Sequence, residues 1–208
     1  VVFSDENGNL IDCDQILGVL ALNLYNQKEL KNNTVVGTIM TNIGFENFLN
    51  NNNINLKRVN VGDRYILDEM LNNNYNLGGE PSGHVIMSDH TKSGDGLLTA
   101  IKIISLLKKS GKKASEFLRP FSITPYKIKN LKKINNYILE NESVKNSLKK
   151  IQLDLKNKHN GRLLVRPSGT EPIVRILVEC EYEDKLDQYI LKVQNLLVKE
   201  NSSQWIKT

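Results

Sequence analysis

Residues 78–84 form a short loop, Gly-Gly-Glu-Pro-Ser-Gly-His, in which a carboxylate, a hydroxyl and an imidazole stand among three glycines. Glycine lets the backbone turn tightly and approach a ligand closely. Glu80 and Ser82 are two residues apart, so in an extended segment their side chains point the same way. A paired acceptor and donor suits the vicinal hydroxyls of a sugar. The alternative is a tight turn whose polar groups satisfy its own backbone.

A second loop, Arg-Pro-Ser-Gly-Thr-Glu-Pro at residues 166–172, has the composition of an anion site. Successive backbone N–H groups and the hydroxyls of Ser168 and Thr170 can line a concave surface that binds anions. An arginine binds phosphate through two parallel hydrogen bonds, and Arg166, Arg175 or both are candidates. In the alternative, the loop is a plain hairpin turn and both arginines are surface residues.

A third group, Gly-Asp-Arg-Tyr at residues 62–65, stands where a predicted strand passes into a predicted helix. Ligands approach α/β folds at such places, so Arg64 is a candidate cation and Asp63 the expected helix N-cap. Asp12 and Asp14 are close in sequence but lack the third acidic group that a magnesium site usually has. We therefore expect no metal site in this chain.

Helices and strands must position the first two of these loops. Over residues 12–119 the pattern of apolar residues alternates between that of a helix and that of a strand. The sequence predicts helices over residues 12–30, 45–49, 63–71 and 96–109, and short apolar strands over residues 35–40, 59–61 and 84–87. Continuous apolar strands of this kind are typical of parallel sheets. The alternation predicts an α/β domain with a largely parallel sheet.

The pattern changes near residue 120. Residues 121–155 are polar and rich in Lys and Asn, with a strand expected near 126–128 and a helix around 144–148. Strands at 162–166 and 173–179 are joined by the second loop. The chain then ends in an amphipathic helix with one apolar stripe: Leu186, Ile190, Val193 and Leu197. This arrangement predicts a smaller α+β domain.

The first eleven residues have the character of a chain already inside a strand. Val1-Val2-Phe3 lie in β-rich sequence, and a hairpin turn is expected at residues 6–9. A domain seldom begins inside a strand that has nothing before it, so we expect upstream sequence to be missing. The expected organisation is the end of a truncated upstream domain at 1–11, the α/β domain at 12–119 and the α+β domain at 120–208.

The basic balance of charge is explained as well by a small anionic substrate as by a nucleic-acid partner. The net charge is +5 and the isoelectric point about 9.1. The lysines are scattered among asparagines and isoleucines rather than gathered with aromatic residues, so we expect no nucleic-acid partner. No segment has the apolar length needed to cross a bilayer, so we expect no membrane partner. Two widely separated cysteines favour a reducing, cytoplasmic setting.

Together these segments resemble the α-D-phosphohexomutase family. Its sugar-contacting loop is similar to residues 79–84 and its phosphate loop to residues 166–172, while residues 37–44, 61–65 and 94–96 fall in the family's order and spacing. The resemblance covers nearly the whole chain and is weakest between residues 121 and 160. Gly169, where other branches commonly carry asparagine, and the Gly-Asp-Arg-Tyr segment favour the branch that acts on glucosamine phosphate.

This resemblance implies that residues 12–119 are the family's third, sugar-binding domain and residues 120–208 its fourth, phosphate-binding domain. The phosphoserine of the family's first domain and the magnesium loop of its second have no counterpart here. The resemblance thus implies a Mg²⁺ cofactor whose ligands are absent from this chain. Arg64 and His84 are expected to line the cleft in a supporting role. The implied substrate contacts are Glu80, Ser82, Gly83, Arg166, Ser168, Gly169, Thr170 and Arg175.

The implied activity converts glucosamine 6-phosphate to glucosamine 1-phosphate through a bisphosphate intermediate, on the route to UDP-N-acetylglucosamine and peptidoglycan. The implied partners are the hexosamine phosphate substrate and the missing N-terminal half of the same protein. The isolated chain is expected to be inactive. The alternatives are a phosphomannomutase or phosphoglucomutase, or a non-catalytic phosphosugar-binding module; a basic nucleic-acid binder is least favoured.

Overall fold

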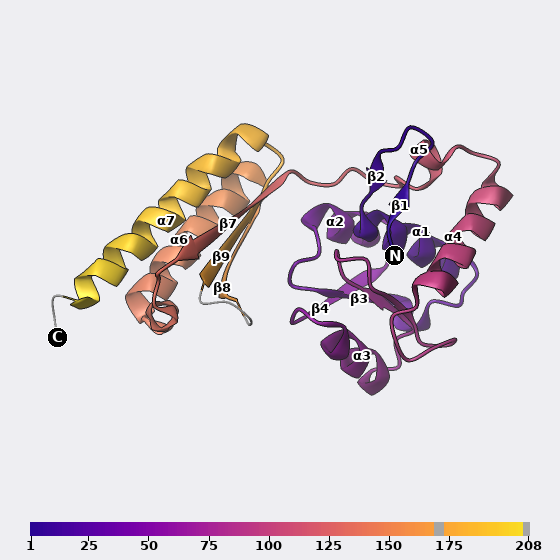
Figure 1. Ribbon diagram of the computed structural model, residues 1–208, viewed down its shortest axis with the longest axis horizontal. Coiled ribbons are helices and arrows are strands. Elements are labelled where there is room, and N and C mark those ends of the chain that lie inside the picture. Colours follow the sequence, from indigo (N-terminus) through magenta and orange to yellow (C-terminus); the bar gives the residue numbers. More distant parts are fainter. Residues whose placement is uncertain (169–172, 206–208) are drawn as a thin grey trace. The chain divides into compact units, whose positions relative to one another are not determined.

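The computed structural model describes residues 1–168 and 173–205, with side chains described up to residue 202. The chain divides into two compact units, Val1–Ile123 and Thr124–Thr208 (Figure 1). The first unit holds an α/β sheet with helices on both faces, and the second a small antiparallel sheet with its own helices. The predicted fold class, an α/β domain followed by a smaller α+β domain, is confirmed.

The first unit opens with the expected hairpin. Strands β1 (Phe3–Ser4) and β2 (Leu10–Ile11) pair antiparallel around a turn. The Asp5 carboxylate accepts hydrogen bonds from the backbone N–H groups of Asn7 and Asn9, each at 2.9 Å, and an ion pair from Arg119 Nη1 at 2.8 Å. Burial of Asp5 opposes its ionisation, yet Arg119 and the two N–H groups lower its pKa from 3.8 to about 2. One carboxylate thus ties the hairpin to the far end of the unit.

The central sheet of the first unit has the strand order β4-β3-β5-β6. Strands β3 (Thr34–Thr38), β4 (Asn55–Val59) and β5 (Leu77–Gly79) are parallel, and β6 (Val85–Met87) returns antiparallel to β5. The sheet is therefore largely parallel, as the sequence predicts. The Gly-rich loop lies between two strands, as expected, but β5 already includes Gly78 and Gly79, which the sequence interpretation placed in the loop.

Helices cover both faces of this sheet. The unit contains α1 (Cys13–Asn26), η1 (Lys31–Asn33), α2 (Ile43–Asn51), α3 (Asp63–Asn72), α4 (Gly96–Ser110) and α5 (Ala114–Phe117). Because successive strand residues face opposite sides, Val35 packs with α1, α2 and α4, whereas Val36 packs with Ile66 and Met70 of α3. Figure 1 shows α3 on one side of the sheet and α1 and α2 on the other.

Capping residues fix where several of these helices begin. Asp12 caps α1 by accepting the N–H of Asp14, and Asp95 caps α4 by accepting the N–H of Leu98 at 2.9 Å. The predicted cap at Asp63 is wrong. Gly62, with a φ of 132°, is the N-cap of α3, and Asp63 is the first helical residue. The glycine supplies a backbone conformation that side-chain-bearing residues avoid.

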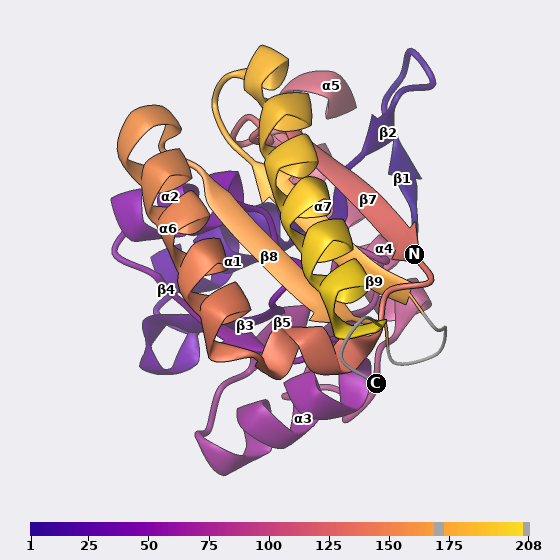
Figure 2. The ribbon, with the colours of Figure 1, turned by 90° about the vertical axis from the view of Figure 1, so that its left-hand side faces the viewer.

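The second unit is a three-stranded antiparallel sheet with two long helices. Its order is β7-β9-β8, with β7 (Tyr126–Lys132), β8 (Arg162–Pro167) and β9 (Ile173–Glu179). The short η2 (Asn136–Glu140) precedes α6 (Glu142–His159), and α7 (Glu183–Trp205) closes the unit. Figure 2 shows α6 and α7 on the same side of β8 and β9. The predicted stripe of α7 is confirmed as core, since each of its four residues is at most 4% exposed.

Candidate functional site

The Gly-rich loop is a tight connection between β5 and β6. The Glu80 N–H donates to the His84 carbonyl at 3.0 Å, and the Gly83 N–H donates to the Glu80 carbonyl at 3.1 Å. Gly83 has a φ of +99°, which a side chain would strain, and a Cβ on Gly79 would lie 2.6 Å from the His84 carbonyl oxygen. The glycines therefore allow the loop to double back within five residues.

Three side chains of this loop meet at one oxygen. Ser82 Oγ donates to Glu80 Oε1 at 2.6 Å, and His84 Nδ1 lies 2.8 Å from the same oxygen. Ser82 Oγ and His84 Nδ1 are themselves 3.0 Å apart. The Glu80 side chain is 11% exposed and that of His84 57% exposed. The second oxygen, Oε2, makes no hydrogen bond to any residue that the structure describes. The loop thus holds one carboxylate oxygen in place and leaves the other to accept from a ligand.

The loop lies at the carboxyl end of the parallel strand β5, the edge at which α/β folds bind ligands. Arg58 strengthens this edge, because its Nη1 donates to the Thr38 carbonyl at 3.1 Å and the Thr41 carbonyl at 2.6 Å, while Nη2 pairs with Glu46 at 3.0 Å. The sequence gives no reason to single out Arg58. Only the parallel pairing of β3 and β4 brings it to these carbonyl groups.

Arg64 interacts with its own helix rather than with the Gly-rich loop. Its side chain is 87% exposed, and its Nε lies 3.8 Å from an Asp68 carboxylate oxygen one helical turn away. Within the described part of the chain, no hydrogen bond or ion pair joins Arg64 to Glu80 or His84. The structure therefore joins Glu80, Ser82 and His84 by hydrogen bonds, and Arg64 is an exposed cation on the first turn of α3.

In the second unit, β8 and β9 place Arg166 directly opposite Arg175. Asn130 of β7 completes the row across the sheet. The neighbouring residues Val165 and Val174 belong to the core beneath α6 and α7, so alternation directs both arginines to the other face of the sheet. Ser168 closes the strand pair by donating its N–H to the Ile173 carbonyl at 2.8 Å. The predicted contacts Gly169 and Thr170 lie outside the described residues.

The two arginines repel each other. Like charges directly opposite on neighbouring strands are destabilising. Burial, and then the charge of Arg175, lower the pKa of Arg166. Arg166 Nε is buried and makes no hydrogen bond to a described residue, while Nη1 reaches the Pro167 carbonyl at 3.3 Å. An anion on this face would offset the repulsion and accept hydrogen bonds from Arg166. The register thus favours the use of both arginines rather than one.

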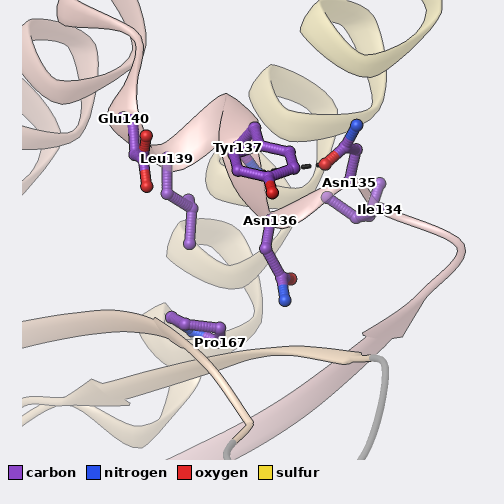
Figure 3. Close-up of a pocket in the computed structure, with 7 residues that line it drawn as sticks. All are labelled: Ile134, Asn135, Asn136, Tyr137, Leu139, Glu140 and Pro167. Carbon is purple, nitrogen blue, oxygen red and sulfur yellow. Dashed lines mark hydrogen bonds between the residues drawn. The ribbon is translucent and has the colours of Figure 1, made fainter.

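A pocket of about 490 Å³ adjoins the end of β8 (Figure 3). It is bounded by Pro167 and by residues in and next to η2, among them Asn136 and Leu139, which point from η2 toward Pro167 in the close-up. Asn135 caps η2 by accepting the N–H of Tyr137 at 3.1 Å. The sequence predicts neither η2 nor this pocket, because residues 133–141 carry no regular apolar pattern.

The described residues do not fit a magnesium site. They contain no group of three His, Cys, Asp or Glu side chains that could hold a metal ion. Asp12 caps α1, and Asp14 Oδ2 accepts the N–H of Asn42 at 2.7 Å. Both aspartates therefore serve the fold. None of the helices that the structure describes combines the length and apolar character needed to cross a bilayer.

Related structures and sequences agree with this layout. N-acetylglucosamine-phosphate mutase in its substrate complex aligns with a TM-score of 0.76 at 17% identity, covering 94% of this chain and 46% of that one. Aspergillus fumigatus N-acetylphosphoglucosamine mutase in complex with GlcNAc-6P and magnesium aligns with a TM-score of 0.75 at 18% identity, covering 94% and 49%. At these identities the likeness concerns the fold.

Sequence relatives are closer. Phosphoglucosamine mutase of Thermoanaerobacter sp. (strain X514) is 43% identical over 199 residues, which are 94% of this chain and 44% of the relative. Phosphoglucosamine mutase of Macrococcus caseolyticus (strain JCSC5402) is 41% identical over 194 residues, which are 93% of this chain and 43% of the relative. The chain thus spans less than half the length of these relatives.

Two family models divide the chain between them. Residues 12–122 match the phosphoglucomutase/phosphomannomutase alpha/beta/alpha domain III, and residues 126–195 match the phosphoglucomutase/phosphomannomutase C-terminal domain. The first match alone covers more than half of the chain. The chain therefore belongs to the phosphoglucomutase/phosphomannomutase family, the α-D-phosphohexomutases that its two loops resemble.

Proposed function

We propose that this chain supplies the sugar-binding and distal phosphate-binding surfaces of a phosphoglucosamine mutase, which interconverts glucosamine 6-phosphate and glucosamine 1-phosphate through a bisphosphate. The observation that carries the proposal is the row of opposed arginines, Arg166 and Arg175, on the face of the second sheet away from α6 and α7. Two half-buried cations that face each other repel, and a dianion bound between them would offset this repulsion and accept hydrogen bonds from both.

The phosphate surface consists of Arg166, Arg175 and Ser168, together with Gly169 and Thr170 of the same segment. It would hold the phosphate group that is not reacting. Binding energy at this distal group is converted into alignment of the sugar at the reacting phosphorus. Because the 1- and 6-phosphates exchange roles, one anchoring site serves both orientations of the bisphosphate.

The sugar surface consists of Glu80, Ser82 and the backbone of Gly83. Glu80 Oε2 would accept from a ring hydroxyl or from the amino group of glucosamine, while Ser82 and His84 keep the carboxylate oriented through Oε1. A carboxylate fixed in this way penalises analogues that cannot donate to it. His84 and Arg64 would lie near the substrate phosphate and offset its charge.

We assign the transferred phosphoryl group and the magnesium ion to residues outside this chain, which spans only 44% of the Thermoanaerobacter relative. The partners in this proposal are a hexosamine phosphate and the preceding half of the same protein, and the setting is the cytoplasm. The alternatives are a phosphomannomutase or phosphoglucomutase, or a phosphosugar-binding module without catalysis. The names of the relatives at 41–43% identity favour glucosamine phosphate.

A chimera tests this function. The chain replaces the matching 199 residues of the Thermoanaerobacter relative, and turnover is assayed on glucosamine, glucose and mannose phosphates. We expect turnover of glucosamine 6-phosphate by the chimera and none by the isolated chain. Turnover of only glucose or mannose phosphates would favour the first alternative.

Calorimetry on the isolated chain provides the second readout, which does not depend on a working chimera. Glucosamine 6-phosphate should bind and be displaced by inorganic phosphate. A chain that binds the sugar phosphate but yields an inactive, folded chimera would support the non-catalytic module. A chain that binds neither compound would refute the phosphate surface.

A further inference from the structure

A second cavity, of about 670 Å³, lies in the first unit between α1, α4 and the segments 27–31 and 87–90. Its size is that of small-molecule sites, and it exceeds two other pockets of this unit, of about 320 and 410 Å³. Asn76 lines it and directly precedes β5, whereas Glu80 follows β5. At the usual rise per residue the two lie about 13 Å apart. The cavity is therefore at the opposite end of the strand from the sugar surface.

The floor of this cavity is apolar. Leu20 of α1 and Met87 of β6 are 2% and 5% exposed, and Leu24 and Leu106 add to the same lining. The floor belongs to the main core of the unit. A flat ring system placed here would cover apolar surface without burying an unpaired polar group of the protein.

One edge of the cavity carries side-chain amide and hydroxyl groups that make no hydrogen bond to a described residue. Asn23 Nδ2 donates to Gln27 Oε1 at 3.1 Å, which leaves the side-chain N–H groups of Gln27 and the side-chain carbonyl of Asn23 without a hydrogen bond to a described residue. Ser105 Oγ of α4 also has none among the described residues. Such donors and acceptors suit the heteroatoms of a nitrogen-containing ring.

The rim is basic. Lys102 and Lys109 lie seven residues apart on α4, two turns along the same face, and Lys28 faces the cavity from the segment after α1. None of these three lysines forms an ion pair with a residue in the described part of the chain. Their ammonium groups can donate charge-assisted hydrogen bonds to a phosphate group.

The carboxylates of the lining do not cancel this charge. Asp89 is already paired, through Oδ1 with Lys31 Nζ at 2.5 Å and through Oδ2 with Asn76 Nδ2 at 2.6 Å. Once the Asp89–Lys31 pair is set aside, the lining has one carboxylate, Glu29, and three lysines, so the net charge of the lining is positive. Asn76, 2% exposed, also accepts the Lys31 N–H at 2.9 Å and donates to the Glu29 carbonyl at 2.8 Å. The wall is therefore fixed before a ligand arrives, which lowers the cost of binding.

We propose that this cavity binds a mononucleotide, with the base between α1 and α4 over the apolar floor and the phosphate at the lysine rim. The apolar floor accounts for the ring faces, the Asn23, Gln27 and Ser105 groups for the ring heteroatoms, and the lysines for the phosphate. The site is independent of the sugar and phosphate surfaces proposed above, since it uses none of their residues.

The test is calorimetric titration of the chain with AMP, GMP, CMP and UMP, the four nucleosides and inorganic phosphate. The Arg166→Ala/Arg175→Ala variant serves as the host, so that phosphate binding on the second unit does not contribute. At least one nucleotide should bind roughly tenfold or more tightly than its nucleoside and than phosphate, because each part contributes affinity. Equal binding of nucleotide and inorganic phosphate would overturn the proposal, as would no binding of any nucleotide at millimolar concentration.

Two further variants locate the site. Lys102→Gln/Lys109→Gln should weaken nucleotide binding roughly tenfold, whereas Lys108→Gln, an exposed lysine of the same turn that does not line the cavity, should leave it unchanged. Ser105→Trp fills the cavity from an exposed position without changing charge, and it should abolish binding while amide NMR spectra show an intact fold. Binding that survives both cavity variants would place the nucleotide elsewhere and refute the proposal.

Discussion

The Gly-rich loop and the arginine row reach a binding-competent geometry in opposite ways. In the loop, Glu80, Ser82 and His84 satisfy one another within five residues, so the carboxylate is oriented by local hydrogen bonds. In the row, Arg166 and Arg175 are held together by strand register although they repel each other. The loop needs no ligand to satisfy its polar groups, and in the proposed function a bound anion would offset the repulsion within the row. The proposed function therefore assigns sugar selectivity to the first unit and phosphate affinity to the second.

The largest expected effect comes from removing both arginines. Arg166→Ala/Arg175→Ala should weaken binding of glucosamine 6-phosphate and of inorganic phosphate by about 2–3 kcal/mol, because charge-assisted hydrogen bonds are lost. Calorimetry measures both ligands. Lys129→Ala is the matched control, since this exposed lysine is on the neighbouring strand β7 but pairs with core-facing Ile176. If the double variant binds both ligands like the parent chain, the row is not a phosphate site.

Removing one of the two arginines tests the repulsion between them. Arg166→Ala alone should leave the free energy of unfolding of the second unit unchanged or raise it by up to about 1 kcal/mol, since a like-charge pair is removed. Urea unfolding followed by NMR gives this value for the unit. A marked loss of stability would mean that the arginines belong to the fold rather than to a ligand site.

Glu80→Gln should have the next largest effect, and a selective one. The amide keeps the size but removes the charged acceptor, so binding of glucosamine 6-phosphate should weaken by about 1–2 kcal/mol. Inorganic phosphate should bind as before. Glu116→Gln, an exposed carboxylate paired with Lys112, is the control. Unchanged discrimination between glucosamine and glucose phosphates would show that the loop is merely a turn.

Acid should lower the stability of the two units to different degrees. The pKa of Asp5 is about 2 in the folded chain against an ordinary 3.8, so its carboxylate stabilises the first unit above about pH 4, and this contribution is lost as the pH falls toward 2. In the second unit, Lys158 and then Tyr189 lower the pKa of Asp154 to about 2. The Asp154 side chain is 31% exposed and that of Asp5 only 2%, so solvent screens Asp154 more strongly.

The first unit should therefore lose stability to acid more steeply than the second, and Asp5→Asn should flatten its pH dependence while lowering its stability at neutral pH. Amide hydrogen exchange resolved by residue measures both units in one sample. Asp184→Asn, at a side chain 69% exposed, is the control and should change the pH dependence of either unit much less than Asp5→Asn changes that of the first. Equal acid sensitivity of the two units would contradict the role given to Asp5.

The elements that the sequence predicts well are those buried along their whole length. The α7 stripe and the run of β3 are examples, because a helix buried on one face leaves its period in the sequence and a strand buried on both faces leaves a continuous apolar run. Helix α6 was underestimated: it spans 18 residues, whereas only residues 144–148 gave a helical signal. Val144 and Leu155 are its fully buried residues, and they are three turns apart, too sparse for a visible stripe. Strand β5, Leu-Gly-Gly, has no pattern of its own and depends on β3 and β6 as partners.

The same distinction applies to the site. The Gly-rich loop could be found from sequence because its groups are within five residues of one another. The sequence alone does not choose between Arg166 and Arg175, because the choice depends on the register of β8 against β9. Asn130 and Arg58 reach their positions only through pairing with strands distant in sequence. Counting outward from the turn would have placed the two arginines opposite each other, had the turn length been known.

The smallest expected effects come from one hydroxyl in each region, and they compare the regions most directly. Ser168→Ala and Ser82→Ala should each weaken binding of glucosamine 6-phosphate by about 1 kcal/mol, the typical net worth of one hydrogen bond. Ser168→Ala should weaken inorganic phosphate to the same degree, whereas Ser82→Ala should leave phosphate alone, because Ser82 acts through the Glu80 carboxylate at 2.6 Å. In the double variant the two losses should add, since the residues share no partner. Calorimetry with both ligands on the four proteins decides this. A phosphate effect from Ser82→Ala, or losses that fail to add, would show that the two surfaces act as one site and that the separation of selectivity from affinity is wrong.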